Sequence, residues 1–239
     1  MLEQQTKGKI YLIPTTMGGE NIDLVAVPFI KEIINHIDNY TVENVKHARR
    51  YLRQLGIDKN IGELSFFELN KRADLTDLPQ FIGQALEGKN IGVISDAGCP
   101  GIADPGAEVV AIAHRKNIQV VPISGPSSIF LSLMGSGFNG QEFVFHGYLP
   151  KEQKDRVKMF REFEKQLIKT DQTQIFMDTP YRNNHVFSDL IAKCRPDTLL
   201  CVACNLTTKD EMIKTMPIFK WKKQRPNLHK KPTMFLLGK

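Results

Sequence analysis

The chain has 239 residues, of which 41% are hydrophobic and 24% charged, enough for a substantial core in one large domain or two modest ones. The sequence lacks the pattern of a signal peptide and any apolar run near the ~18 residues that span a bilayer, so we expect a cytoplasmic protein with no membrane partner. The net charge is +6, and the positive excess comes entirely from the C-terminal segment, because the residues from Lys214 onward include eight Lys or Arg and no Asp or Glu.

The first half of the chain alternates between strand and helix patterns. Short apolar runs predict strands, and apolar residues at helical spacing predict the helices between them. The expected strands are residues 9–14, 40–43, 64–69, 91–94 and 118–123, and the expected helices are residues 27–34, 45–55, 75–86, 107–116 and 129–134. This order predicts an N-terminal α/β domain with a parallel sheet.

Three loops of small and polar residues follow expected strands. They are residues 15–21, 95–106 and 124–128. Because crossovers between parallel strands are right-handed, such loops leave from the carboxyl edge of one sheet, where α/β folds bind their ligands. In the second loop Asp96 can accept a hydrogen bond from a ligand, whereas Asp104, just before Pro105, is expected to cap the next helix.

Other ligand motifs are excluded by their context. Residues 83–89 have most of the spacing of a phosphate-binding loop, but they lie between a helix and a strand instead of leading from a strand into a helix. Residues 135–140 have the spacing Gly-x-Gly-x-x-Gly, but they follow an expected helix instead of a strand, so an ordinary dinucleotide site is not expected. No nucleophile elbow is present, so hydrolase chemistry is not expected either.

A second domain follows a flexible-looking span near residue 137. We place the boundary so that residues 1–126 form the N-terminal domain and residues 127–239 a C-terminal α/β domain with a mixed sheet. Its expected strands are residues 143–150, 174–178, 198–205 and 231–237, and its expected helices are residues 151–169 and 183–194. Cys201 and Cys204 have the spacing of half a zinc site, but within a strand we interpret them as core thiols and expect no metal.

The basic C-terminal segment has two interpretations. Lys222, Lys223 and Arg225 could contact RNA phosphates, with Phe219, Trp221 and His229 as possible stacking groups. The alternative is a solvated tail with no function. The same choice applies to Lys46, Arg49 and Arg50 on the expected helix at 45–55.

Four motifs in order carry a family resemblance. Residues 95–106 read Ser-Asp-Ala-Gly-Cys-Pro-Gly-Ile-Ala-Asp-Pro-Gly, and they resemble the signature loop of the ribosomal RNA small-subunit 2′-O-ribose methyltransferases in the tetrapyrrole methylase superfamily. The further matches are Ser-Gly-Pro-Ser-Ser at 124–128, Phe145 with Gly-Tyr-Leu-Pro at 147–150, and Asp-Thr-Pro-Tyr-Arg at 178–182.

The resemblance implies two α/β domains, a homodimer and S-adenosylmethionine in the cleft between the domains. It also implies a set of cofactor-binding residues: Thr16, Asp96, Gly98, Cys99, Pro100, Ser127, Ser128, Met177, Ala203, Cys204, Asn205 and, more weakly matched, Thr233. The topology, without the resemblance, also predicts that three of these regions bind the ligand: the loops after the strands at 9–14, 91–94 and 118–123.

Departures from the family fall where the methyl acceptor should bind. The family reads about Thr-Pro-Ile-Gly-Asn where this chain has Thr-Thr-Met-Gly-Gly at 15–19, and its Glu-Asp-Thr-Arg-His-Thr becomes Glu-Asn-Val-Lys-His-Ala at 43–48. Glu43, Asn44 and His47 are therefore the candidate catalytic residues, although an amide cannot act as a base. The family's Arg-Glu-Leu-Thr-Lys likewise becomes Cys-Asn-Leu-Thr-Thr at 204–208.

Three functions remain open from the sequence. The first is a methyltransferase acting on a ribose of ribosomal RNA, with the small ribosomal subunit as partner. The second is a methylase of a small acceptor such as a tetrapyrrole, and the third is an RNA-binding protein without catalytic activity.

Overall fold

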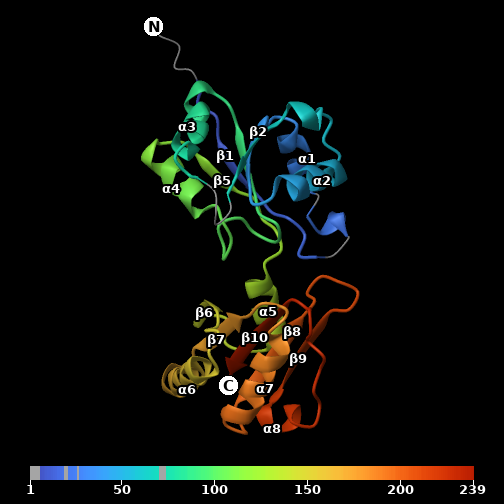
Figure 1. Ribbon diagram of the computed structural model, residues 1–239, viewed down its shortest axis with the longest axis vertical. Helices are drawn as coiled ribbons and strands as arrows, with labels where there is room; N and C mark the ends of the chain where they lie inside the picture. The colour runs from blue at the N-terminus through green and yellow to red at the C-terminus, as the bar shows by residue number, and fades with distance from the viewer. Residues whose placement is uncertain (1–5, 19–20, 26, 70–73) are drawn as a thin grey trace. The chain divides into compact units, whose positions relative to one another are not determined.

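The computed structural model describes residues 6–18, 21–25, 27–69 and 74–239. The chain divides into two compact units, Met1–Ser127 and Ser128–Lys239, and each contains one five-stranded sheet (Figure 1). Helices separate the strands in both units, except between two neighbouring strands of the second unit, so the expectation of a two-part α/β protein is confirmed. Among the described residues, no helix is both long and apolar enough to cross a membrane.

The sheet of the first unit is entirely parallel, in the order β3-β2-β4-β1-β5. The strands are β1 (Ile10–Ile13), β2 (Asn39–Val42), β3 (Ser65–Glu68), β4 (Ile91–Ile94) and β5 (Val120–Pro122). Each falls within or beside an expected strand, and the central ones are buried runs of branched residues. Because the strands are parallel, the loops after β1, β4 and β5 share one edge, as predicted.

Two helices cover each face of this sheet, as Figure 1 shows. They are α1 (Pro28–Ile34), α2 (Val45–Leu55), α3 (Leu78–Gly83) and α4 (Ala107–Arg115), with short 3-10 turns at Ile22–Leu24, Ile61–Glu63 and Gln84–Glu87. One apolar cluster packs α1 and α2 on the sheet, and a second packs α3 and α4 on the opposite face. The expected helix at 75–86 is shorter than predicted, because it starts at Leu78 with Pro79 in its first turn and continues as a 3-10 turn.

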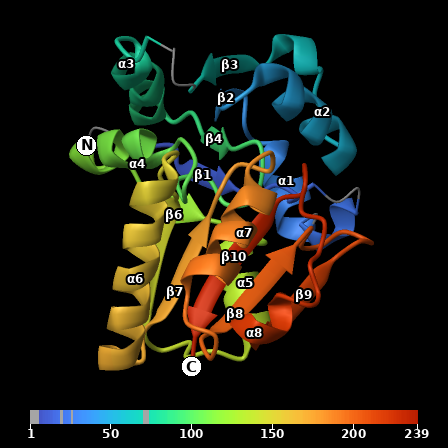
Figure 2. The same ribbon diagram turned by 60° about the horizontal axis from the view of Figure 1, so that its bottom comes forward.

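The second unit contains the predicted mixed sheet, in the order β6-β7-β10-β8-β9. Only β6 and β7 pair in parallel. The strands are β6 (Phe143–Tyr148), β7 (Thr173–Met177), β8 (Leu199–Cys204), β9 (Met212–Pro217) and β10 (Thr233–Gly238), and the helices are α5 (Ser128–Ser136), α6 (Gln153–Thr170), α7 (Asn183–Lys193) and α8 (Ile218–Trp221). Figure 2 shows α6 and α7 on one face, over an aromatic core, and α5 on the other.

The edge strand β9 and the short helix α8 were not predicted. Lys214 and Thr215 interrupt the apolar run of β9, so the sequence hides a strand that pairing with β8 reveals. Trp221 in α8 is only 2% exposed, and its indole N–H donates to the carbonyl of Leu200 at 2.9 Å. The interpretation of Trp221 as a group that stacks on bases is therefore wrong, because its ring belongs to the core.

The two cysteines of β8 lie on opposite faces of the sheet. Cys204 belongs to the aromatic core cluster under α6 and α7, whereas Cys201, three residues earlier, does not. Burial raises the pKa of the Cys201 thiol to about 11. Both side chains are buried and behave as core thiols.

Candidate functional site

Three loops meet at the carboxyl edge of the first sheet. The amide of Thr15, after β1, donates to the carbonyl of Gly98, after β4, at 2.8 Å. The Cys99 thiol donates to the carbonyl of Pro126, after β5, at 3.4 Å. The sequence predicted that these loops share one edge, and the hydrogen bonds show that they contact one another.

Glycine is favoured at two positions in these loops, for different reasons. Gly98 has φ of +73°, a left-handed backbone conformation that side chains with a Cβ rarely adopt. At Gly125 a Cβ would lie 2.1 Å from the Cβ of Pro14, so no larger residue fits between these two loops. The loop after β1 is described as far as Gly18; Gly19, one of the departures from the family pattern, lies outside the described residues.

A histidine and a carboxylate meet at this edge. Asn44 ends the connection from β2 and caps α2, because its Oδ1 accepts a hydrogen bond from the amide of His47 at 3.1 Å. This places His47 in the first turn of α2, where its Nδ1 lies 3.0 Å from Oδ2 of Asp96 in the loop after β4. Strands β2 and β4 are neighbours in the sheet, which is why residues 49 apart in the sequence come together.

Glu43 completes this group. Its Oε2 accepts a hydrogen bond from the backbone amide of Asp96 at 3.2 Å. The candidate residues Glu43 and His47 are therefore brought together, and Asp96, predicted to bind the cofactor, joins them. Asn44 differs in role, because its side-chain oxygen is used by the helix cap.

His47 and Asp96 border a cavity of about 230 Å³. The lining residues are Thr15, Thr16, His47, Ala48, Arg50, Tyr51, Gln54, Ile94, Ser95 and Asp96. The Tyr51 hydroxyl donates to the carbonyl of Pro14 at 2.5 Å, which fixes α2 against the loop after β1. The side chains of His47 and Asp96 stay 49% and 38% exposed, so a molecule in the cavity can reach them.

The geometry of the His47–Asp96 pair fits a general base. An ionised carboxylate only accepts hydrogen bonds, so a neutral imidazole beside Asp96 carries its proton on Nδ1 and a lone pair on Nε2. Nε2 can then take a proton from a hydroxyl group bound in the cavity. The sequence indicated His47 as a candidate but showed no partner for it, because Asp96 lies on another loop.

Asp104 does not cap α4, contrary to the prediction. The helix begins after Gly106, and no side chain caps it. Asp104 instead lies where burial, and then the charges of Glu43 and Asp96, raise the pKa of its carboxyl group to about 6.

The variant Asp104→Asn tests this placement. A raised carboxyl pKa means that the fold disfavours the charged form, so the penalty is absent below about pH 4 and complete above about pH 6. Because Asp104 is only partly buried, we expect Asn to raise the free energy of unfolding at about pH 8 by only about 1–2 kcal/mol, and by nothing near pH 4. Urea denaturation at both pH values measures this. The exposed Asp77→Asn is the control, and an equal gain from it would contradict the assignment.

In the second unit, the predicted cofactor residues gather at one edge of the sheet. Met177 ends β7, Cys204 ends β8 and Thr233 starts β10, the strand that pairs with both. Ala203 precedes Cys204 in β8, and Asn205 donates its amide to the carbonyl of Pro232 at 2.9 Å. Ser127 ends the first unit and Ser128 begins α5.

Next to Met177 the structure leaves one buried acceptor unpaired. Oδ1 of Asp178 accepts from the amide of Thr179 at 2.6 Å and from Nε of Arg182 at 2.9 Å. Within the described part of the chain, Oδ2 of Asp178 is buried and has no hydrogen-bond donor. A buried acceptor without a partner is costly, so this atom can receive a donor group of a bound molecule.

The predicted RNA contacts lie at the surface of the two units. On α2, Lys46, Arg49 and Arg50 are exposed; Arg50 lines the cavity beside His47, and the guanidinium of Arg49 lies 5.2 Å from the ring centroid of Phe66. In the second unit, Lys222, Lys223 and Arg225 follow α8 and are exposed.

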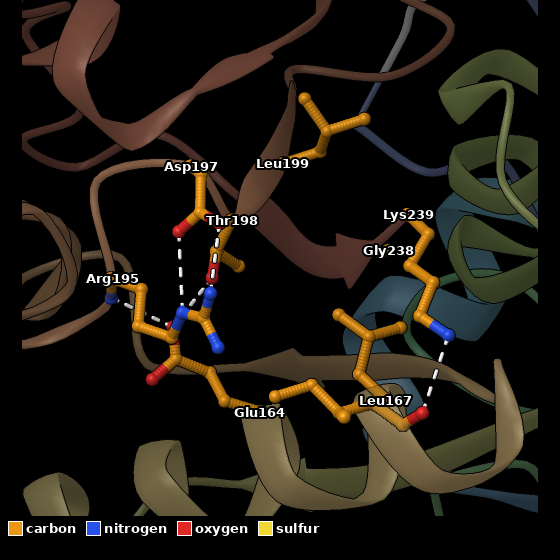
Figure 3. A pocket seen from close by; sticks show the side chains of 9 residues that line it. Glu164, Leu167, Arg195, Asp197, Thr198, Leu199, Gly238 and Lys239 are labelled. Carbon is orange, nitrogen blue, oxygen red and sulfur yellow. Dashed lines mark hydrogen bonds and ion pairs between the residues drawn. The ribbon is translucent and has the colours of Figure 1, made fainter.

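A second cavity, of about 410 Å³, lies at the other end of the second sheet (Figure 3). It is bordered by the start of β8 and the end of β10, opposite the edge that holds Met177. Its buried carboxylate, Glu164, accepts from the amide of Arg195 at 2.8 Å and from the Thr198 hydroxyl at 2.6 Å. Arg195 pairs with Asp197, so these polar groups already have partners and the hollow is structural.

Fold and site together define an α/β protein with a cavity at the carboxyl ends of the strands of its first sheet. The family model of tetrapyrrole (corrin/porphyrin) methylases matches residues 12–220. The chain therefore belongs to the tetrapyrrole methylase family and is a methyltransferase. Among the described residues, no group of three or more His, Cys, Asp or Glu is placed to hold a metal ion.

Relatives and solved structures agree with this assignment. The chain is 30% identical to "Ribosomal RNA small subunit methyltransferase I" of Halalkalibacterium halodurans over 79% of this chain, but it spans only 61% of that protein. The protein of the same name from Buchnera aphidicola is 30% identical over 96% of this chain and 78% of its own length. The resemblance stated from the motifs is thus confirmed.

The structural neighbours show the same fold. The methyltransferase CobJ has a TM-score of 0.61 at 17% identity and covers 97% of this chain and 94% of its own. The uroporphyrin-III-C-methyltransferase of Thermus thermophilus has a TM-score of 0.55 at 15% identity, covering 97% and 92%.

Proposed function

We propose that the chain is an S-adenosylmethionine-dependent methyltransferase that modifies the 2′-hydroxyl of a ribose in small-subunit ribosomal RNA. The names of its relatives support the RNA, and the His47–Asp96 pair beside exposed cations is the observation that carries the chemistry. The proposal places the chain in the cytoplasm with the ribosomal subunits, and family resemblance favours a homodimer.

The residues at both sheet edges fit a methyl donor of this kind. S-adenosylmethionine would supply a methyl group already activated by its sulfonium. Its ammonium, hydroxyl and amino groups are hydrogen-bond donors. Asp178 Oδ2, which has no donor within the described part of the chain, can accept a hydrogen bond from such a group. In the first unit, the loop after β4 around Gly98, Cys99 and Pro100 would hold it, together with Thr16 and Ser127. In the second unit, Ser128, Met177, Ala203, Cys204, Asn205 and Thr233 would do so.

His47 would act on the acceptor. Nε2 of His47 would take the proton of the ribose hydroxyl as its oxygen receives the methyl group that S-adenosylmethionine would supply. Asp96 holds Nδ1 and stabilises the imidazolium that results. Arg50, on the cavity wall, can bind a neighbouring phosphate. Alignment of the two reactants by such contacts can remove roughly 7–11 kcal/mol from the barrier.

The decisive experiment incubates the protein with small ribosomal subunits and S-adenosylmethionine carrying a tritiated methyl group. We expect label in the RNA, at a position whose 3′ phosphodiester then resists alkaline hydrolysis, as a methylated 2′-oxygen requires. Label in an added tetrapyrrole but not in RNA would instead identify a small-acceptor methylase. RNA binding with no calorimetric signal from S-adenosylmethionine would identify a non-catalytic RNA-binding protein.

The basic segment after α8 should contribute to RNA binding through phosphates. Replacing Lys222, Lys223 and Arg225 by Ala removes three cations, so we expect the slope of log affinity against log salt to become shallower by about 2. Fluorescence anisotropy with single-stranded RNA over a range of salt concentrations measures the slope. Lys154, Lys158 and Lys165 on α6 form the control triple, because their replacement removes the same charge elsewhere on the unit. Equal slopes for the two triples would leave the segment as a solvated tail.

A further inference from the structure

An exposed aromatic group lies at the proposed donor edge of the second sheet. Tyr181, in the turn between β7 and α7, is 67% exposed. The ring of His229 meets it edge to face, with centroids 6.2 Å apart, and Nζ of Lys230 lies 5.9 Å from the centroid of the Tyr181 ring. The turn follows the end of β7, and His229 and Lys230 precede the start of β10, so the group shares its edge with Met177 and Thr233.

The two segments that form this group are fixed to each other. The amide of Lys230 donates to the carbonyl of Pro180 at 3.0 Å, and Nδ2 of Asn183 donates to the carbonyl of Lys231 at 2.7 Å. The turn itself is closed by the ion pair between Arg182 and Asp178. These contacts hold the turn in a fixed conformation with the Tyr181 ring exposed, which lowers the ordering cost of binding a partner.

The chemistry of the group matches an unpaired nucleotide. A π-face open to solvent stacks on a base of any sequence, and adjacent cations attract the backbone phosphates. Lys230 supplies the cation at the ring, and the exposed Lys222, Lys223 and Arg225 precede it in the same segment.

We propose that Tyr181, His229 and Lys230 form a stacking platform for an unpaired base of the RNA substrate. This inference rests on the proposed function, since it takes RNA as the substrate. It assigns to the second unit the task of holding the RNA strand, separately from the proton transfer assigned to His47.

The test uses the intact protein and a single-stranded RNA that carries the fluorescent base 2-aminopurine at successive positions. Stacking on an aromatic ring quenches this base, so wild-type protein should quench it at one position. We expect Tyr181→Ala to abolish that quenching and weaken RNA binding by about tenfold, whereas Tyr181→Phe, which keeps the π-face, should retain both. Phe29→Ala is the matched control, an exposed aromatic residue on α1 of the first unit.

The outcomes separate this inference from the proposed function. Wild-type quenching and binding that Tyr181→Ala leaves unchanged, or an equal loss in Phe29→Ala, would overturn the platform while methylation of RNA still supports the function. A change in sedimentation instead of RNA binding would assign Tyr181 to a contact between copies of the chain, and would also overturn it. RNA binding without methylation would overturn only the function, and no RNA binding by wild-type protein would overturn both.

Discussion

Replacing His47 by Ala should lower kcat for methylation of small-subunit RNA by about 100- to 10,000-fold, the usual contribution of a general base. A ribose hydroxyl is a weak nucleophile, and without His47 only water or a distant group can take its proton. The affinity for S-adenosylmethionine and for RNA should change little, because Nε2 acts on the reacting hydroxyl. Single-turnover methylation, with calorimetry for the donor, separates the two effects.

The histidine prediction has a matched control and an internal test. His36→Ala removes an exposed histidine just before β2, at the opposite edge of the same sheet, and should leave kcat unchanged. If Asp96 acts only through His47, Asp96→Ala should lower kcat little further in a protein that already carries His47→Ala. If the two residues act independently, the activation free energies lost in the two single variants should add in the double variant. Full activity of His47→Ala would remove the base from the mechanism.

Gly125→Ala should impair both folding and donor binding. The added Cβ would lie 2.1 Å from that of Pro14, so the loops after β5 and β1 must separate. Overpacking of this kind costs about 1–3 kcal/mol of stability. The displaced loop carries Ser127, proposed to contact the donor, and a binding loss of about 1.4 kcal/mol raises the Kd for S-adenosylmethionine about tenfold.

Thermal unfolding and calorimetric titration measure these two losses in the same preparation. Gly140→Ala is the control, since a Cβ at Gly140 meets no atom within 4 Å and its backbone is not in the left-handed region. Donor affinity equal to wild type in a folded Gly125→Ala protein would show that the loop contact does not shape the donor site.

Local patterns predicted most of the fold. Strand and helix periodicity located nine of the ten strands in the described residues, because each of those is a short apolar run between turn residues. It missed β9, whose polar residues are tolerated at a sheet edge, and it misplaced Trp221, because a basic neighbourhood says nothing about which side chain turns into the core. Asp104 was misassigned for a related reason, since the sequence does not show the charges of Glu43 and Asp96 around it.

By itself the sequence determined the order of elements, the three loops of the ligand edge and the family, all of which are properties of contiguous residues. Only the tertiary structure decided which loops and side chains meet. His47 meets its partner Asp96 on another loop, and Tyr181 meets its cation and its neighbouring ring in the segment before β10. The physical reason is that strand order sets these pairings: β2 lies next to β4, and β7 next to β10. The strand order depends on how the whole sheet packs, so it cannot be inferred from any single stretch of residues.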